Sequence, residues 1–344
     1  MTLVSRRDLF GMAAMAGILS AEDGPALAPL FRDPIFDGAA DPVVIWNRQE
    51  QNWWMVYTQR RANVDTQGVA WVHGCDLGVA RSVDGGRTWR YLSVLPGLEF
   101  ERGRNTFWAP EILWHDGTYH MFASYVPGVP NDWSGSRRIV HYTSADLWTW
   151  RCLGPLTLSS ERVIDACVEQ VKPRLWRLWY KDEGNQSHTY AADSPDLHQW
   201  TVRGPAITGP GHEGPNVFRW RGSWWMITDH WDGLGVFRSD DAESWARQPQ
   251  NILREPGHRP EDGVKGGHAD VLVQGDDAWI FYFTHPGRAA GAKPPAPAEG
   301  VQPYALRRSS IQVASLELDG QSIICRRDEA VPFRLKPGVD NWTR

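Results

Sequence analysis

Five short aromatic segments recur along this chain at similar spacing, and this repetition limits what the chain can fold into. They are WWMVYT at 53–58, YHMFAS at 119–124, WRLWYK at 176–181, WWMITD at 224–229 and AWIFYF at 278–283. Aligned on Met55, Met121, Leu178, Met226 and Ile280, they lie 66, 57, 48 and 54 residues apart. Periods of this length, built from short strands, indicate an array of similar units rather than one ordinary sheet.

Each aromatic segment is the second of four runs in its unit. Apolar runs precede the five segments at 42–46, 110–114, 166–171, 215–220 and 270–273, and turn residues separate several of these pairs, as expected of hairpins. A third run ends in a Ser-x-Asp-x-x-x-Trp turn, as at 144–150, where the Ser and Asp side chains can cap the turn. A fourth run follows. The sequence therefore predicts an all-β fold, a five-bladed β-propeller with four antiparallel strands per blade.

The fifth unit is irregular. Residues 284–308, rich in Pro, Ala and Gly, separate its second and third strands, and we expect a long surface loop there. The segments 309–316 and 322–327 would complete the blade, and residues 31–36 would pair where the ring closes. Because no linker interrupts the repeats, residues 29–344 are predicted to be one domain, acting as a monomer.

The N-terminus resembles an export signal. Arg6 and Arg7 precede an apolar run at 11–21, which is typical of a twin-arginine signal, and the triplet 26–28 is a candidate cleavage site. We expect residues 1–28 to be this signal and the protein to be periplasmic or extracellular; the alternative is a plain N-terminal tail. The apolar run is too short to span a membrane as an ordinary helix.

The amino-acid composition limits the classes of ligand that this protein is expected to bind. The 36 basic and 41 acidic residues give a net charge of −5 without any basic run, so nucleic acid is not an expected partner. The 20 Trp exceed what the repeats need and suit stacking against sugars. The four Cys form no Cys-x-x-Cys pair, which argues against a zinc site. Cys152 and Cys167 are close enough in sequence to bridge neighbouring blades, although buried free thiols are the default expectation.

Three acidic residues lie at nearly the same place in their units. Asp41 lies 14 residues before the centre of its aromatic segment, and Asp165 and Glu213 each lie 13 before theirs. Because first strands line the axis of a propeller, we expect these carboxylates to meet at one mouth of the channel. Like charges and partial burial there would raise at least one pKa and place a protonated acid beside an ionised base. Cleavage of a glycosidic bond requires such a pair, whereas acids that only cap strand ends would not.

Four motifs resemble those at which the blades of glycoside hydrolase family 43 begin. They are ADPVVI at 40–45, WAPEI at 108–112, VIDA at 163–166 and HEGP at 212–215. They occur in the family's order, one per blade, within about residues 33–327. The resemblance implies a five-bladed propeller that cleaves arabinosides, xylosides and similar sugars with inversion. It implies Asp41 as general base, Glu213 as general acid and Asp165 as the group that orients the acid and sets its pKa.

The chain departs from this family in two motifs. Glu111 replaces the usual Asp of Trp-Ala-Pro-Asp, and Ala166 follows Asp165 where Pro is common. The neighbouring family 117 shares the propeller, acts on anhydrogalactosides of algal polysaccharides and uses a His as acid, so a resemblance to it would imply an anhydrogalactosidase. His268, 12 residues before Ile280, enters the fifth blade at a similar height. His268 is therefore a candidate acid, a candidate group linked to a Ca²⁺ or Na⁺ on the axis, or a core His. No organic cofactor is implied.

Several residues are predicted to bind the carbohydrate substrate: Trp108, Glu111, His268, Arg61 and Lys181. Trp108 appears to share the register of Asp41 and would floor a sugar subsite. Arg60, Arg61, Lys181 and Lys265 lie near the expected mouth; if two of them face inward, the substrate would have a carboxylate or sulfate. The alternative is that they are solvated surface charges.

These observations together predict an exported glycosidase. The long loops 126–137 and 286–308 would close one end of the cleft, which favours exo action on a terminal sugar. Two alternatives stay open: a propeller that binds a glycan without cleaving it, which would not need all three acids, and a protein-interaction propeller, which would have no acidic funnel.

Overall fold

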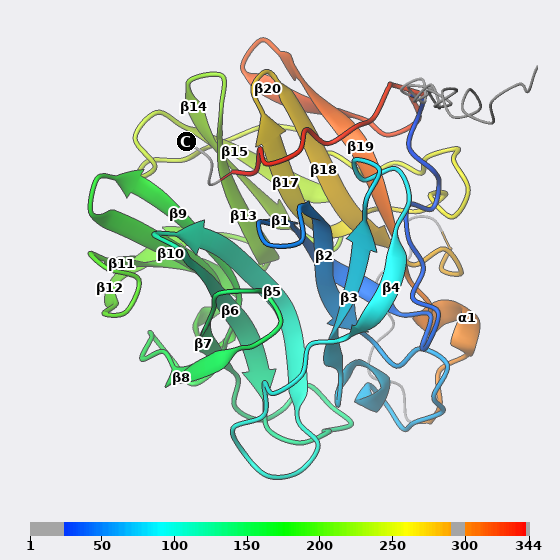
Figure 1. Cartoon of the computed structure of the whole chain (residues 1–344), viewed down its shortest axis with the longest axis vertical. Helices are drawn as coiled ribbons and strands as arrows, with labels where there is room; N and C mark the ends of the chain where they lie inside the picture. The colour runs from blue at the N-terminus through cyan, green and yellow to red at the C-terminus, as the bar shows by residue number, and fades with distance from the viewer. Residues whose placement is uncertain (1–23, 290–299, 342–344) are drawn as a thin grey trace, which may run out of the picture.

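The computed structural model describes residues 24–289 and 300–341, which form five four-stranded antiparallel sheets arranged as a five-bladed propeller (Figure 1). The prediction of five blades with four strands each is confirmed. The twin-arginine motif at Arg6 and Arg7 lies outside the described residues. Within the part of the chain that the structure describes, no helix is both long and apolar enough to cross a membrane.

Each blade is one continuous stretch of chain whose strands pair in sequence order. Blade 1 contains β1 (Ala39–Asn47), β2 (Asn52–Gln59), β3 (Asp76–Ser82) and β4 (Arg90–Val94). Blade 2 contains β5 (Thr106–His115), β6 (Thr118–Val126), β7 (Arg138–Ser144) and β8 (Arg151–Pro155). Blade 3 contains β9 (Val163–Lys172), β10 (Leu175–Asp182), β11 (His188–Ser194) and β12 (Thr201–Ile207). Blade 4 contains β13 (Glu213–Trp220), β14 (Ser223–Asp229), β15 (Leu234–Ser239) and β16 (Ala246–Arg247). Blade 5 contains β17 (Gly267–Gln274), β18 (Asp277–Thr284), β19 (Ser310–Asp319) and β20 (Ser322–Arg326).

Three short helical turns lie outside the blades: η1 (Ala70–Val72), η2 (Glu183–Asn185) and α1 (Tyr304–Arg307). The predicted surface loop between β18 and β19 thus includes one turn of helix, α1, in its described part.

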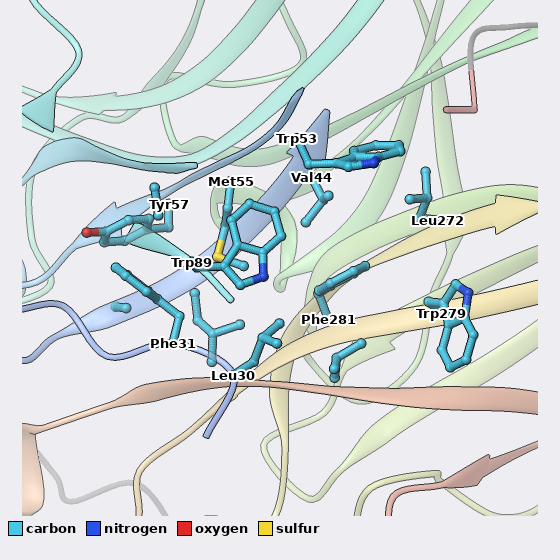
Figure 2. Packing of buried hydrophobic residues seen from close by; sticks show 14 of the residues in the cluster. Leu30, Phe31, Val44, Trp53, Met55, Tyr57, Trp89, Leu272, Trp279 and Phe281 are labelled. Atoms are coloured by element: carbon cyan, nitrogen blue, oxygen red, sulfur yellow. The ribbon is translucent and has the colours of Figure 1, made fainter. Parts of the chain in front are cut away.

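Apolar packing closes the ring between blades 1 and 5. Side chains from both blades form one buried cluster that includes Phe31, Trp53, Met55, Trp279 and Phe281 (Figure 2). Phe31 exchanges two backbone hydrogen bonds with Ile311 of β19, at 3.1 and 2.9 Å. The expected pairing of residues 31–36 at the closure is therefore seen, as an isolated bridge at Phe31.

Both ends of the described chain lie against this closure. Phe333 and Leu335 join the apolar cluster, and the Phe333 N–H donates to the Gly24 carbonyl oxygen. Pro25 forms a bridge with Pro332, and Ala26 packs against the same cluster. Cleavage of a signal after residue 28 would remove the contacts made by residues 24–28.

The first strand of every blade is bulged at one equivalent position. The β1–β2 pairing shifts between Ala40 and Val43, and the β5–β6, β9–β10, β13–β14 and β17–β18 pairings shift at the corresponding place. Four bulge residues have left-handed backbone angles: Asp41 with φ 48°, Ala109 with 40°, Asp165 with 57° and Gly214 with 58°. Three of these are not glycine, so the fold accepts a conformational cost of about 1–2 kcal/mol at each.

Four of the five bulges, those of blades 2 to 5, turn a backbone N–H toward the preceding blade, where a side chain accepts it. The pairs are Ala109 N to Thr58 Oγ1 (2.9 Å), Asp165 N to Ser124 Oγ (2.9 Å), Gly214 N to Asp165 Oδ2 (3.0 Å) and His268 N to Asp229 Oδ2 (3.0 Å). Thr58, Ser124 and Asp229 occupy one register at the ends of their second strands, opposite Ala40, Trp108 and Glu213. The blades are thus joined by hydrogen bonds at the mouth of the channel.

A second set of such bonds lies three residues deeper along the axis. The pairs are Val44 N to Asp270 Oδ2 (2.8 Å), Val168 N to Glu111 Oε1 (3.0 Å), Val217 N to Cys167 Sγ (3.1 Å) and Val271 N to Asn216 Oδ1 (3.1 Å). Glu111 is one of these acceptors, and burial raises the pKa of its carboxyl well above the usual value. Its prediction as a substrate-binding residue is therefore corrected: it joins blades 2 and 3 inside the axis.

All four cysteines are free thiols. Cys152 lies on β8, at the outer edge of blade 2, whereas Cys167 lies on β9, the innermost strand of blade 3. The default expectation of free thiols therefore holds, and the alternative of a bridge between Cys152 and Cys167 does not, because the propeller places these two strands at opposite radii.

The bonds between blades can be tested at Thr58, which is fully buried. Thr58→Val keeps the shape of the side chain but leaves the Ala109 N–H without its acceptor, so we expect the free energy of unfolding to fall by about 1–3 kcal/mol. Urea unfolding followed by tryptophan fluorescence measures this change. Thr58→Ser retains the hydroxyl and is the matched control; equal destabilisation by both changes would show that the bond contributes nothing.

Candidate active site

A cavity of about 400 Å³ opens at the mouth where the first strands begin. Six of the eight residues predicted as catalytic or substrate-binding line it: Asp41, Trp108, Asp165, Lys181, Glu213 and His268. They come from all five blades, from the starts of first strands and, for Lys181, from the end of a second strand. The cavity therefore gathers the three predicted carboxylates at one place.

The three carboxylates do not share one register, which corrects the sequence alignment. Val44 pairs with Met55 and Val168 pairs with Leu178, and Asp41 and Asp165 each lie three residues before those valines. Glu213 lies four residues before Val217, the partner of Met226, so Glu213 is one position earlier.

Spacing along the chain gave the wrong register because the loops within the blades differ in length. Residues 48–51 connect β1 to β2, whereas only residues 221–222 connect β13 to β14, so spacing along the chain mixes loop length with register. Trp108 likewise shares the position of Glu213, not that of Asp41, because it pairs with Ser124 as Glu213 pairs with Asp229.

Asp41 is held by a two-pronged contact with Arg60. Arg60 Nη2 lies 3.0 Å from both Asp41 carboxylate oxygens, and the guanidinium stands over the Phe283 ring at 4.7 Å. His268 Nδ1 lies 3.6 Å from Asp41 Oδ1 on the other side. The Asp41 side chain is only 7 % exposed, so these contacts fix its orientation toward the cavity.

Glu213 is the more accessible carboxylate, with 28 % of its side chain exposed. Lys181 Nζ lies 2.9 Å from Glu213 Oε2 and 3.2 Å from Glu183 Oε1. Although burial opposes its charge, the Lys181 ammonium holds the pKa of Glu213 below its usual value. An acid at this position must therefore lose part of that ion pair before it can take up a proton at neutral pH.

Asp165 supports the backbone beside Glu213. Its Oδ2 accepts the N–H of Gly214, and its own N–H donates to Ser124 Oγ. Burial raises the pKa of Asp165 to about 6; the His268 ring opposes this rise and the Glu213 charge adds to it. Asp165 is thus placed to orient the segment that presents Glu213.

Asp229 is a fourth cavity carboxylate, and the sequence analysis missed it. It ends β14, pairs with Glu213 across the ladder, and accepts the N–H groups of Trp231 and His268. Burial and then the Glu213 charge raise its pKa to about 7. The signal that would have found it is its register, since it ends its aromatic segment where Thr58 and Ser124 end theirs.

His268 lies between the base and acid candidates. A Cβ atom on Gly214 would lie 2.7 Å from the His268 ring, so the glycine beside Glu213 makes room for the imidazole. The described residues contain no group of three or more His, Cys, Asp or Glu side chains arranged to hold a metal ion. A Ca²⁺ or Na⁺ near His268 therefore stays a prediction without a ligand set.

Aromatic side chains form much of the remaining wall: Trp71, Trp108, Trp133, Trp231 and Phe283. Trp108 Nε1 donates to the Val72 carbonyl oxygen at 2.6 Å, which fixes its ring. Arg61 does not line the cavity; its guanidinium donates to the carbonyl oxygens of His73 and Ala70, at 2.8 and 2.7 Å. Its prediction as a substrate-binding residue is corrected, since it holds the loop behind the wall.

The segment after β18 also contributes to the cavity, through His285, Arg288 and Gln302. His285 Nδ1 lies 2.9 Å from the Arg308 carbonyl oxygen, and Arg60 Nη1 lies 3.4 Å from His285 Nε2. Burial, with the Arg288 and Arg60 charges, lowers the pKa of His285 well below its usual value. His285 is therefore neutral and can accept from Arg60.

The raised pKa of Asp229 makes stability depend on pH. The folded protein retains this proton up to about pH 7, whereas the unfolded chain releases it near pH 4, so folding stability falls as pH rises through that window. We expect Asp229→Asn to flatten the decline in melting temperature between pH 5 and 8. Asp116→Asn, in an exposed turn, is the control; an unchanged slope in Asp229→Asn would contradict the assignment.

Comparison with known proteins gives similarity of fold. No protein-family model matches the chain, and no curated protein sequence does. Among solved structures, a thermostable family-43 glycoside hydrolase is 15 % identical with a TM-score of 0.63, covering 89 % of this chain and 100 % of that one. An endo-1,4-β-xylanase from Bacteroides thetaiotaomicron is 16 % identical with a TM-score of 0.61, covering 87 % and 97 %.

A third structure, a family-43 β-xylosidase/α-arabinofuranosidase from a compost microbial metagenome, is 12 % identical with a TM-score of 0.60, covering 87 % of this chain and 97 % of that one. The shared region includes nearly the whole length of these three proteins, so the likeness concerns the complete propeller. The chain has the five-bladed propeller fold seen in family-43 glycoside hydrolases.

Proposed function

We propose that this protein is a glycoside hydrolase that cleaves glycosidic bonds with inversion. The observation that supports this most is the convergence of Asp41, Asp165 and Glu213, from three blades, on one cavity walled by tryptophans. A glycan-cleaving site needs a paired acid and base beside apolar faces that stack on sugar rings. The fold likeness raises the expectation, but the proposal rests on the site.

Asp41 is assigned as the general base that activates water. Arg60 and His268 hold its carboxylate at the cavity wall, so the water that it activates would have a fixed position. Glu213 is assigned as the general acid because its greater exposure lets it reach the leaving oxygen. Inversion requires these two carboxyl groups to stand roughly 6.5–9.5 Å apart, with the sugar and the water between them.

Glu213 can take up a proton only when its ion pair with Lys181 is weakened, because that ion pair stabilises the ionised carboxylate. A sugar hydroxyl that takes over one hydrogen bond of Lys181 would weaken the ion pair and raise the pKa of Glu213. Asp229 faces Glu213 across the β13–β14 ladder and holds its proton up to about pH 7, so it can share a proton with the acid. Asp165 orients the acid through the Gly214 N–H.

The proposed substrate is a terminal arabinoside, xyloside or galactoside-like sugar of a plant or algal glycan. Trp133, from the loop between β6 and β7, and Arg288, from the segment after β18, both line the cavity. Loops that wall the cavity in this way favour exo action on a chain end. The predicted export signal would bring the enzyme to such polymers.

Two alternatives lead to different measurements. In a mechanism like that of family 117, His268 would be the acid; its contact with Asp41 instead supports a place beside the base. In a propeller that only binds glycans, sugar would bind without release of product, and the carboxylates would serve to join blades.

The decisive experiment is sugar release from aryl glycosides and plant or algal oligosaccharides. Glu213→Gln keeps the shape of the side chain but removes the acid, so we expect kcat on substrates with poor leaving groups to fall about 10²- to 10⁴-fold. His268→Ala is compared in parallel. Activity that survives in Glu213→Gln but vanishes in His268→Ala would move the acid to His268, and binding without release would favour the non-catalytic propeller.

A second prediction concerns the pH profile. Lys181→Met removes the ammonium that lowers the pKa of Glu213, so Glu213 should stay protonated to higher pH. The basic limb of the kcat/KM profile, which reports the acid of the free enzyme, should therefore shift upward. A basic limb that stays in place would show that another group donates the proton.

A further inference from the structure

Two cationic side chains in the cavity form no salt bridge with a carboxylate among the described residues. Arg60 pairs with Asp41, and Lys181 pairs with Glu213 and Glu183. Arg288 and Lys265 line the same cavity, but the hydrogen bonds of their side chains go to backbone oxygens. Arg288 Nε donates to the Leu306 carbonyl at 2.9 Å, and Lys265 Nζ donates to the Trp231 carbonyl.

Arg288 thus keeps the two outer nitrogens of its guanidinium without an acceptor in the described part of the chain. Burial and then the Arg60 charge lower its pKa to about 10, so its surroundings disfavour the cation. Burial also lowers the pKa of Lys265, although the charges of Asp229 and Asp232 oppose this from beyond salt-bridge distance. Charges kept in a partly desolvated cavity without a counter-ion are costly unless a ligand supplies one.

Hydrogen bonds and tight backbone packing hold the Arg288 side chain in place. Its backbone N–H donates to the His285 carbonyl at 3.0 Å, and its Nε donates to Leu306. A Cβ atom on Gly287 would lie 1.9 Å from the Ala305 carbonyl oxygen, so the two stretches around Gly287 and Ala305 are in tight contact. A guanidinium fixed at its Nε leaves a planar pair of donors that matches two oxygens of one oxyanion.

We infer that the sugar bound in this cavity has an anionic substituent, a carboxylate or a sulfate, which Arg288 binds through its two free nitrogens with Lys265 as the second cation. This inference rests on the proposed function and names the substrate class of the same site. A neutral pentose would leave the outer nitrogens of Arg288 without a counter-ion, and Lys265 with only the more distant charges of Asp229 and Asp232. The acidic residues that would do the chemistry are separate, since Arg60 and Lys181 already neutralise part of their charge.

Binding is tested first, without catalysis. Calorimetry measures how the full chain binds D-glucuronate, D-galacturonate and D-galactose 6-sulfate, with D-xylose and D-galactose as neutral sugars for comparison. The result shows whether the anionic group that binds is a carboxylate or a sulfate. Arg288→Met should weaken binding of the favoured anionic sugar about 10- to 100-fold, the range expected for charge-assisted hydrogen bonds. Arg238→Met, on β15 beside Asp240 and outside the cavity, is the matched control.

Hydrolysis is tested on pairs of aryl glycosides that differ only in the C5 carboxylate: D-glucuronide against D-xyloside, and D-galacturonide against L-arabinopyranoside, in both anomers, with sulfated galactosides beside galactosides. The ratio of kcat/KM for the anionic member to that for the neutral member should fall about 10- to 100-fold in Arg288→Met. Arg288→Lys keeps the positive charge but not the paired guanidinium donors, so it should restore part of the lost preference for the anionic substrate.

The two proposals fail separately. Hydrolysis of neutral glycosides that depends on Glu213, with a ratio that Arg288→Met leaves unchanged, would overturn the anionic substrate and leave the glycosidase. Binding of an anionic sugar that depends on Arg288, without cleavage of any glycoside, would support the cation site and overturn the glycosidase. Equal binding of neutral and anionic sugars, or equal effects of Arg288→Met and Arg238→Met, would overturn the inference.

Discussion

The propeller depends on hydrogen bonds that each bulged first strand makes to the blade before it. The bulges at Asp41, Ala109, Asp165 and Gly214 hold the backbone in left-handed conformations, and those at Ala109, Asp165, Gly214 and His268 point N–H groups across the gap between blades. A buried N–H without an acceptor is expensive, so each neighbouring blade must provide one. In the first two blades a hydroxyl suffices. In the third and fourth, a carboxylate takes its place.

The use of carboxylates as acceptors in blades 3 and 4 links the architecture to the chemistry of the site. Asp165 and Asp229 are desolvated because they stand between blades, and the same burial raises the pKa of each carboxyl. Glu213 lies beside both of them, at the start of β13. Carboxyls that hold their protons near neutral pH are what an acid catalyst requires. Under the proposed function, the residues that join the blades as acceptors also tune the site, so a substitution of Asp165 or Asp229 would affect both stability and activity.

The sequence predicts the blades well and the site only in part. Aromatic second strands and Ser-x-Asp-x-x-x-Trp turns recur because each blade buries equivalent faces of its sheet. The number of these repeats therefore predicts the number of blades. Asp229, Arg288 and His285 could not be predicted in this way. Asp229 ends a strand that looks like the other aromatic segments, and the two others belong to the irregular segment after β18, which has no counterpart in the other blades. Glu111 and Arg61 look like site residues in sequence. Their orientation is set instead by nearby backbone groups: Glu111 accepts the N–H of Val168, and Arg61 donates to the carbonyl oxygen of His73.

Closure of the ring has a consequence for how the protein would respond to heat or denaturant. Blade 1 and blade 5 are each formed by one stretch of chain, so no shared strand crosses the seam between them. An apolar cluster, the two chain ends and the hydrogen bond from Val44 N to Asp270 Oδ2 hold it instead. Asp41 lies on one side of this seam and His268 on the other. A small separation there would misplace Asp41, the proposed water-activating group, while all five sheets stayed intact. Inactivation would then precede loss of secondary structure, and the seam would set the working lifetime of the protein.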